Sequence, residues 1–553
     1  MSISFQRRRG ELETLIKQRK AEQIVNFEWA RKNFEKLDEN RLEEIANLDF
    51  FELRDALQSG KCLPVETLLA FQRKALKSHA TTNCICMFIE ESLTIAEGLE
   101  QNLKDADYCK PPLFGIPISI KECIRVKFMD STQGCAQHLY KPSREHAASV
   151  DQLIRLGAVP FVHTNVPQAL LSFGCSNPIY GSTSNPCDSS RVPGGSSGGE
   201  AALIAAGGSV LGIGTDVGGS VRTPATFCGL AAFKSSSRRG SQLGTVSSIP
   251  GRQLLVTVEG PIAPTIDACV EYLRLKWNDS ELSRRDFYVP PVNFREHLYD
   301  SDEPLRIGYY TFDGYQTAPA AYRRAVLDAV GVLRELGHHL EEFCVPRAAH
   351  AFNIFCAAAT SDGGVFLNEL LSNDIVPPEC YVGPPVTRLP YFIQRILRKY
   401  LPDERVKGVL RELPHNSEEM REMHEKIEDY RHEFVNAMRK QKLDAIVCPA
   451  FGTLAPHHGI PNQMISATSY TSLFNLVDFA AGTIPITRVS ANDESVDEAT
   501  MPCDDRWNQL IRRESTGCRG MPISVQIAAP PFREEICLRI LRQIQNKIGI
   551  ARN

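Results

Sequence analysis

Short apolar runs and longer amphipathic stretches take turns along most of the chain. An apolar run of roughly four to eight residues fits a buried strand, whereas apolar residues that recur every three or four positions fit a helix face. The runs that fit strands are 159–162, 305–310, 340–344 and 444–448. The stretches that fit helices are 144–156, 319–336 and 418–440. Strands that alternate with helices are typical of an α/β layered sheet, so we predict one large α/β domain.

Residues 1–80 are more charged than the rest and look helical throughout. Asp49 and Glu52 have the spacing of a capping box, the pair of reciprocal side-chain bonds that opens a helix, and Gly60 is placed to end that helix. Pro64 suits the first turn of the next helix, because its missing N–H would have no partner there. We therefore predict a helical, charged N-terminal segment over residues 1–80 and the main domain over residues 81–553.

Composition places the chain among ordinary globular proteins. Hydrophobic residues make up 43% and charged residues 23% of its 553 residues, and the formal net charge is −4. A balance so close to neutral argues against a nucleic-acid partner. The 17 cysteines are scattered without a C-x-x-C pair, and no HExxH motif occurs. We therefore expect reduced thiols, no metal site and an intracellular protein.

No stretch of the sequence has the pattern of a signal peptide or of a membrane-spanning helix. The first residues lead into Arg7, Arg8 and Arg9 without an apolar run behind them. The best candidate span, 201–214, is interrupted by glycines and is shorter than the roughly 18–20 apolar residues that a bilayer requires. We expect a chain that does not cross a membrane.

Two glycine- and serine-rich loops, 193–200 and 214–222, carry the strongest chemical signal. No lysine follows either loop in the way that a phosphate-binding P-loop requires. The glycine spacing of the second loop fails the dinucleotide-binding fingerprint, and Pro224 stands where that motif would open a helix. The G-x-S-x-G run around Ser196 matches the nucleophile elbow of α/β-hydrolases, but the residues before it are not an apolar strand. An acyl-transfer site of another kind explains the loops better.

A candidate nucleophile lies at the end of the second loop. The run Val217-Gly-Gly-Ser220 combines a hydroxyl with backbone N–H groups that can turn toward a developing oxyanion. Such a serine needs a base, and no histidine lies in either loop. Lys121 ends a strand-like run in which isoleucines alternate on one face while Ser119 and Lys121 share the other. Burial there would lower the pKa of the lysine and make its neutral amine available as the base.

Taken together, these motifs resemble the fingerprint of the amidase signature family: Gly-Gly-Ser-Ser-Gly-Gly at 194–199 and Gly-Thr-Asp-Val-Gly-Gly-Ser at 214–220. The further matching runs are Gly115-Ile-Pro-Ile-Ser-Ile-Lys-Glu, Phe161-Val-His-Thr-Asn-Val-Pro-Gln, Cys175-Ser-Asn-Pro and Gly520-Met-Pro-Ile-Ser-Val-Gln. The likeness runs from about residue 60 to the C-terminus and implies the amidase signature fold, a large mixed β-sheet covered by helices. It also implies that residues 81–553 form an amidase catalytic domain with a Ser–Ser–Lys triad, whose first serine follows a cis peptide bond.

The resemblance assigns a role to each residue at a matching position. Ser220 is expected to be the nucleophile, Ser196 the proton relay, and Lys121 the base that later acts as the acid. The residues expected around the oxyanion and the substrate are Val217, Gly218, Gly219, Ser220, Leu170 and Ser196. The expected supporting residues are Ser197, Asp216 and Arg222. This mechanism passes through an acyl-enzyme and uses no cofactor and no metal.

Within the family the chain is most similar to the fatty acid amide hydrolases. This implies cleavage of lipid amides, such as N-acylethanolamines and primary fatty amides, to a fatty acid and an amine, and it implies a homodimer. The alternatives are a soluble amidase, the catalytic subunit of a tRNA-dependent amidotransferase, or a lipid esterase such as a monoacylglycerol hydrolase. Thr360 stands where relatives have an aromatic residue and Leu170 where they have a methionine, which favours a different acyl chain or head group.

An apolar helix stripe with basic neighbours follows residue 388. Its members at helical spacing are Leu389, Phe392, Ile393, Ile396 and Leu397. A second short amphipathic helix is expected after Pro402. The stretch from Arg388 to Arg411 contains seven basic and two acidic residues. Such stripes pack in cores or lie on anionic membranes, and the basic excess, with the two-helix cap that the resemblance implies, favours a membrane. We predict an amphipathic membrane cap over residues 388–413 and a peripheral, membrane-associated protein on an endomembrane face.

Overall fold

The computed structural model describes residues 3–35, 37–380, 396, 400, 401, 403–494 and 505–549. The strands are β1 Ile85–Phe88, β2 Pro117–Lys121, β3 Val159–Thr164, β4 Ser176–Asn177, β5 Gly181–Ser182, β6 Gly212–Asp216, β7 Ala231–Lys234, β8 Val258–Ala263, β9 Arg306–Tyr309, β10 His339–Glu342, β11 Ala445–Pro449, β12 Ala480–Arg488 and β13 Pro522–Ala529. The helices are α1 Ile3–Phe34, α2 Glu39–Ala46, α3 Phe50–Ser59, α4 Pro64–Thr82, α5 Glu91–Asn102, α6 Ala148–Arg155, α7 Gly198–Ala205, α8 Arg222–Cys228, α9 Ile266–Asn278, α10 Ser280–Arg285, α11 Glu296–Tyr299, α12 Ala320–Glu335, α13 Ala348–Thr360, α14 Val365–Ser372, α16 Glu404–Glu412, α17 Ser417–Lys440, α18 Ser469–Leu476, α19 Ala491–Glu494, α20 Arg506–Glu514 and α21 Glu534–Ile548.

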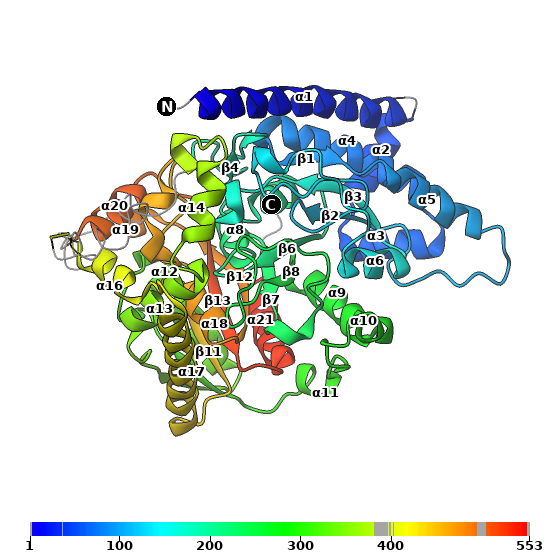
Figure 1. Ribbon diagram of the computed structural model, residues 1–553. Coiled ribbons are helices and arrows are strands. Elements are labelled where there is room, and N and C mark those ends of the chain that lie inside the picture. Colours follow the sequence, from blue (N-terminus) through cyan, green and yellow to red (C-terminus); the bar gives the residue numbers. More distant parts are fainter. Residues whose placement is uncertain are drawn as a thin grey trace.

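One mixed sheet forms the centre of the molecule, with helices on both sides (Figure 1). Its order is β1-β3-β2-β6-β8-β7-β12-β13-β11-β9-β10 within the described residues. β3, β2 and β6 run parallel at one end and β11, β9 and β10 at the other, while the strands between them pair antiparallel. The predicted α/β architecture, a large mixed sheet covered by helices in one domain, is confirmed.

Several elements lie where the sequence pattern predicts them. The stretches 319–336 and 418–440 become α12 and α17, and the capping box of Asp49 and Glu52 opens α3, which Gly60 ends in the left-handed conformation. The stretch 144–156 gives a shorter helix, because the N–H of Ala147 donates to the carbonyl of Arg125 (2.8 Å) and ties that segment to another loop.

The expectation that no helix opens near Pro224 is wrong. Helix α8 starts at Arg222 and contains Pro224 in its first turn. A proline is tolerated at this place because the first N–H groups of a helix have no intrahelical partner to lose.

The N-terminal helices share the hydrophobic core of the sheet. Ala30 of α1, Leu53 of α3 and Phe71 of α4 are all buried in the same cluster as the strands. Helix α4 also runs past residue 80, so the predicted domain boundary falls inside a helix.

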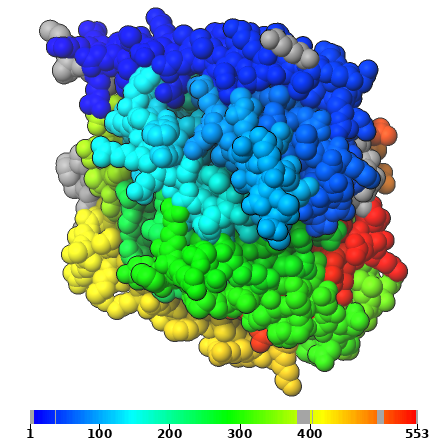
Figure 2. Space-filling view, turned by 90° about the vertical axis from the view of Figure 1, so that its right-hand side faces the viewer, coloured from blue at the N-terminus to red at the C-terminus, as the bar shows by residue number. Residues whose placement is uncertain are grey.

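Helix α1 covers the open edge of the sheet at β1 (Figure 1). In the space-filling view this helix lies along the top of the molecule (Figure 2). The side chain of Asn26 accepts from the N–H of Phe88 (2.7 Å) and donates to its carbonyl (3.1 Å). Gln23 donates to the carbonyls of Ile85 (3.1 Å) and Cys86 (2.9 Å). Side-chain amides thus take the place of a neighbouring strand and satisfy an edge that would otherwise invite pairing with another chain.

We expect Asn26→Ala to loosen α1 from β1. The change leaves the peptide groups of Phe88 without their partner, and a buried unsatisfied polar group costs about 1–3 kcal/mol. Faster proteolytic cleavage within α1, at a temperature where the rest of the protein stays folded, would show this. Val25→Ala is the matched control, because Val25 is 69% exposed on the same helix. Equal cleavage of both variants would contradict the role of Asn26.

Candidate active site

Lys121 ends β2, a strand whose residues are all buried between β3 and β6. Its side chain is fully buried, as the sequence predicts. Nζ donates to Ser196 Oγ (2.8 Å), to Thr215 Oγ1 (2.8 Å) and to the carbonyl of Thr215 (3.3 Å). Burial lowers the pKa of Lys121, because the charged ammonium loses its hydration. The geometry therefore places an amine that deprotonates readily against a serine hydroxyl.

Ser196 lies in the loop that leads into α7, and no strand precedes it, so the elbow of an α/β-hydrolase is absent here. The peptide bond between Gly195 and Ser196 is cis. Gly195 must be a glycine, because a Cβ at this position would collide with the carbonyl oxygens of Ser172 and Gly174. The backbone next to Ser196 thus packs closely against the loop that contains Ser172 and Gly174.

Ser197 joins the two glycine- and serine-rich loops. Its N–H donates to the carbonyl of Ser220 (3.1 Å). Its hydroxyl accepts from the N–H of Thr215 (3.3 Å) and lies 3.4 Å from the carbonyl of Thr215. Ser196 and Ser220, which are far apart in sequence, are thereby held on facing loops that line the same cavity.

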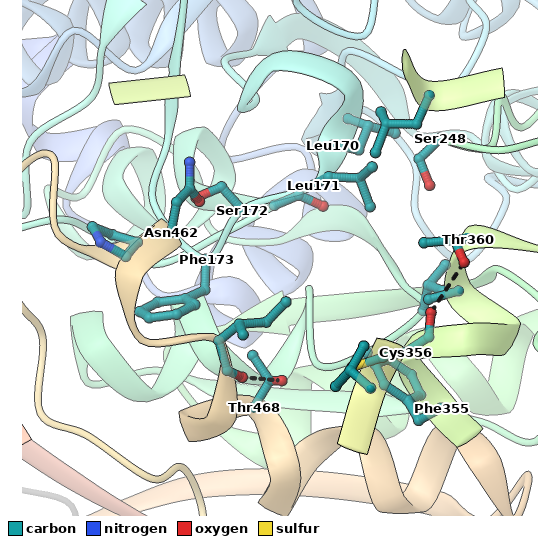
Figure 3. Close-up of a pocket in the computed structure, with 18 of the residues that line it drawn as sticks. Leu170, Leu171, Ser172, Phe173, Ser248, Phe355, Cys356, Thr360, Asn462 and Thr468 are labelled. Carbon is teal, nitrogen blue, oxygen red and sulfur yellow. Dashed lines mark hydrogen bonds between the residues drawn. The ribbon is translucent and has the colours of Figure 1, made fainter. Parts of the chain in front are cut away.

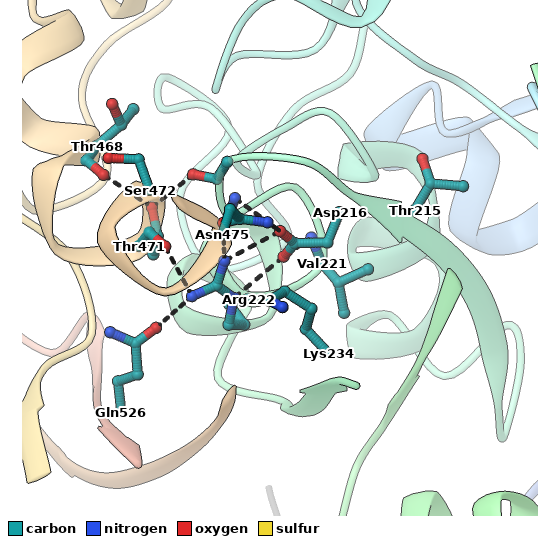
Figure 4. A network of polar contacts seen from close by, with 12 residues as sticks. Thr215, Asp216, Val221, Arg222, Lys234, Thr468, Thr471, Ser472, Asn475 and Gln526 are labelled. Carbon is teal, nitrogen blue, oxygen red and sulfur yellow. Dashed lines mark hydrogen bonds and ion pairs between the residues drawn. The ribbon is translucent and has the colours of Figure 1, made fainter. Parts of the chain in front are cut away.

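A buried ion pair fixes the turn that carries Ser220 (Figure 4). The carboxylate of Asp216 accepts two bonds from Arg222 (3.0 and 3.1 Å), and both side chains are fully buried. It also accepts from the N–H groups of Gly219 (2.9 Å) and Val221 (3.1 Å). Burial alone would raise the pKa of Asp216, but the guanidinium of Arg222 holds it well below its usual range.

Arg222 in turn connects the turn to the far half of the sheet. Its guanidinium donates to the carbonyl of Thr471 (3.0 Å), to Asn475 Oδ1 (2.6 Å) and to Gln526 Oε1 (2.6 Å). Asn475 also donates to Asp216 (2.9 Å). Besides Asp216, the acceptors around the guanidinium are therefore groups of α18 and β13.

The N–H groups predicted for an oxyanion hole are not all available. The N–H of Gly219 is already bonded to Asp216, whereas those of Val217, Gly218 and Ser220 have no hydrogen-bond partner among the described residues. Gly219 has a φ of +124°, and a Cβ there would collide with Thr471, so the turn requires a glycine. Of the four N–H groups expected to face a substrate oxygen, that of Gly219 thus has a partner in the structure.

A cavity of about 800 Å³ opens beside this turn (Figure 3). Leu170, Ser196, Val217 and Ser220 line it, as the sequence predicts. Its apolar wall is made by Leu171, Phe173, Tyr315, Phe352, Phe355, Val406, Val409, Leu410 and Leu413. Such a space, mostly apolar and open to the serine that would react, suits a long hydrocarbon chain next to a reacting group.

The second half of the predicted membrane cap has a different place in the structure. Val406, Val409 and Leu410 of α16 line the cavity, and α16 packs against α13. The basic Arg405 pairs with Asp505 (2.7 Å) instead of pointing at a free surface. This helix therefore turns its apolar side chains inward.

Of the predicted cap stripe, Leu389, Phe392, Ile393 and Leu397 lie outside the described residues. Ile396 is described and is 56% exposed. None of the described helices is both long enough and apolar enough to cross a bilayer. The described residues also contain no cluster of three or more His, Cys, Asp or Glu side chains suited to a metal ion.

Some site residues escaped the sequence analysis. Thr215, the second partner of Lys121, stands directly before Asp216 in the second loop. Its position inside that motif could have identified it as a site residue. Gln526 ends the matching run that starts at Gly520, but nothing in that run indicated its contact with Arg222. Asn475 stood in no recognised motif, and only the fold brings it to Arg222. Arg252, which also lines the cavity, stood in no recognised motif.

Comparison with known proteins agrees with this geometry. The model of the Amidase family matches residues 66–538. Fatty acid amide hydrolase 1 of Caenorhabditis elegans is 44% identical over 537 residues, which cover 97% of this chain and 94% of that protein. Fatty-acid amide hydrolase 1 of Sus scrofa is 36% identical over 512 residues, or 91% of this chain and 86% of that protein.

A solved structure of a fatty acid amide hydrolase has the same fold. Its TM-score to this chain is 0.78 at 25% sequence identity, and the match covers 98% of this chain and 90% of that one. Because the family model spans most of the chain and the relatives match nearly its whole length, this chain belongs to the amidase family.

Proposed function

We propose that this protein is a serine hydrolase that cleaves long-chain fatty acid amides to a fatty acid and an amine. The observation that supports this most is the 2.8 Å hydrogen bond between buried Lys121 and Ser196, beside a large apolar cavity that Ser220 also lines. The relatives from Caenorhabditis elegans and Sus scrofa, both called fatty acid amide hydrolases, support the same substrate class.

The reaction starts from Lys121 in its neutral form. The amine takes a proton from Ser196, Ser196 takes one from Ser220, and the oxygen of Ser220 attacks the amide carbon. The C–N bond then breaks, and the leaving nitrogen receives its proton from Lys121 through Ser196. The acyl group stays on Ser220 as an ester until water, deprotonated by the same relay, releases the fatty acid.

The turn of residues 217–220 stabilises the negative charge that develops on the substrate oxygen. The N–H groups of Val217, Gly218 and Ser220 serve as donors, while that of Gly219 stays with Asp216. Donors that are fixed before the reaction stabilise a transition state without having to reorganise. Asp216 and Arg222 act as positioning residues because they hold this turn rigid.

The apolar cavity holds the acyl chain, and the same relay would also cleave a lipid ester of similar shape. Amide and ester substrates differ in the leaving group alone, so turnover of matched pairs decides between an amidase and a lipid esterase. A soluble short-chain amidase would leave the wall of Phe355, Val406 and Leu410 without a purpose.

The protein meets its lipid substrate at a membrane surface. Ile396 is 56% and Tyr400 is 79% exposed, and both belong to the basic stretch between Arg388 and Arg411, a combination that suits contact with an anionic membrane. Assembly into a homodimer stays a prediction from the family resemblance.

Purified protein should release oleic acid from oleamide and from N-oleoylethanolamine, and Ser220→Ala should abolish this release. A fluorophosphonate probe, which reacts with activated serines, should label the parent protein once and the Ser220→Ala variant not at all. The loss has a chemical cause, because Ser220 supplies the attacking oxygen.

Ser190→Ala is the control for the labelling, since Ser190 lies in an exposed loop. Labelling that persists in Ser220→Ala and disappears in Ser196→Ala would identify Ser196 as the nucleophile. Faster turnover of acetamide, or of monooleoylglycerol, than of N-oleoylethanolamine would favour the short-chain amidase or the esterase.

The value of kcat/KM should rise with pH through the pKa of Lys121. Since burial lowers this pKa below 10.5, the neutral base is reached at a lower pH than for an exposed lysine. Lys121→Met, which keeps the volume but not the amine, should lower kcat/KM by about 10²–10⁴ and remove this rise. Lys104→Ala, at an exposed lysine, is the control. Near-native turnover by Lys121→Met would mean that another group is the base.

Binding to anionic vesicles should weaken with ionic strength but not vanish. Basic residues near anionic headgroups contribute roughly 1 kcal/mol each, which salt screens, whereas apolar burial contributes about 25 cal/mol per Å² and survives. A double change, Ile396→Ser with Leu397→Ser, should release the protein in a vesicle sedimentation assay and slow long-chain turnover.

The matched control changes Ile24 and Val25 to serine, because both are apolar and exposed on α1 (64% and 69%). If the Ile396 and Leu397 variant unfolds, or loses turnover of a short soluble amide to the same degree, the stripe packs in the protein core.

A further inference from the structure

Arg252 forms a charged corner in the mostly apolar cavity. It lies in the loop between β7 and β8 and lines the cavity together with Ser247, Ser248 and Thr257. Its guanidinium donates to Ser247 Oγ (2.6 Å) and Ser248 Oγ (3.1 Å), and weakly to the carbonyl of Ala359 (3.4 Å). The three acceptors are neutral oxygens, and they hold the guanidinium in place at the wall of the cavity.

No carboxylate among the described residues forms an ion pair with Arg252. Its Nε is buried and has no hydrogen-bond partner there either. Arg405, another arginine of the same cavity, shows the contrast, because it pairs with Asp505 (2.7 Å) and donates to Gln316 (2.6 Å). Burial without a counter-charge lowers the pKa of Arg252 to about 10, so the group still carries its charge at neutral pH.

A guanidinium that is bonded to neutral oxygens in this way still lacks a counter-charge, which a bound anion would supply. A half-buried charge loses hydration, and a carboxylate with two oxygens matches the fork of an arginine. Ser247 bonds to Thr257 (3.1 Å) and both hydroxyls can reorient, so the corner offers further donors. Figure 3 shows Ser248 and Thr360, the neighbour of Ala359, on the same side of the cavity.

The two ends of a substrate have different surroundings in the cavity. Phe355 of α13 lies against Gly218 of the oxyanion turn, and the wall continues with Val409 and Leu410 of α16. An acyl chain belongs along this wall, because it can bury apolar surface there. The polar corner at Arg252 is then left for the part of the substrate on the other side of the scissile bond, the amine.

We propose that Arg252 binds a carboxylate on the amine half of the substrate, so that the preferred substrates include N-acyl amino acids. This inference rests on the proposed function. Hydrolysis follows the same steps: the amide C–N bond breaks, Ser220 takes the acyl group, and the leaving nitrogen of the amino acid receives the proton from Lys121 through Ser196. The carboxylate stays bound to Arg252 throughout.

The test compares N-oleoylglycine with N-oleoylglycinamide, its neutral counterpart of the same shape, by release of oleic acid. In Arg252→Gln the ratio of kcat/KM for the acid over the amide should fall roughly ten- to a hundredfold, because a hydrogen bond to a charged group is lost. Arg252→Lys keeps the positive charge but not the two parallel N–H donors of the guanidinium. Its ratio of kcat/KM for the acid over the amide should lie between that of the parent protein and that of Arg252→Gln. An unchanged ratio in Arg252→Gln would overturn the proposal.

Two further measurements keep the result clear. N-oleoylglycine should bind the non-reactive Ser220→Ala protein more tightly than N-oleoylglycinamide in calorimetry, and this preference should disappear in Ser220→Ala with Arg252→Gln. A monoamide of a long-chain dicarboxylic acid carries its charge on the acyl end, so a larger effect of Arg252→Gln on that substrate would place the anion at the wrong end and overturn the proposal.

Failure of the proposed function looks different from failure of this inference. If the parent protein hydrolyses no oleoyl amide at all, the proposed function is wrong. If it hydrolyses N-oleoylethanolamine but treats acid and amide alike, the function holds and the role of Arg252 is wrong.

Discussion

The buried ion pair of Asp216 and Arg222 is the contact on which the site depends. Asp216 ends β6 and holds the turn that carries Ser220, while Arg222 opens α8 and reaches Asn475 and Gln526 in the other half of the sheet. Two charges can be buried without loss of stability only when their hydrogen bonds are satisfied, and here every neighbour supplies one. The turn of residues 217–220 is therefore anchored to β6, α18 and β13 through this ion pair.

Burial disfavours the charged form of both ionisable groups closest to the turn, but the outcomes differ. Asp216 stays ionised because the ion pair with Arg222 outweighs burial, whereas the hydrogen bonds of Lys121 go to hydroxyl and carbonyl oxygens and burial lowers its pKa. The same low-dielectric interior thus holds a paired carboxylate charged for structure and makes the unpaired amine easier to deprotonate for proton transfer. The difference lies in the partner, not in the depth of burial.

The cavity combines an apolar wall with charged side chains, of which Arg252 is one. Helices α13 and α16 supply the wall, and α16 was expected to face a membrane because its pattern of basic and apolar residues is the same in either place. An amphipathic pattern states that one face is buried but not what buries it. Arg252, in contrast, stands out only once the described residues are seen to bond it through neutral oxygens and to form no ion pair with it.

The sequence alone determined the alternation of helices and strands, the capping of α3, and the glycine- and serine-rich loops with Lys121. These features depend on residues close together in the chain, where backbone geometry and side-chain periodicity decide. Only the tertiary structure decided that Gly219 gives its N–H to Asp216, that α16 turns inward, that Pro224 lies within α8, and that Arg252 forms no ion pair within the described part of the chain. Each of these depends on which groups from distant segments meet in space, because burial and hydrogen-bond partners are properties of the packed fold and not of the local sequence.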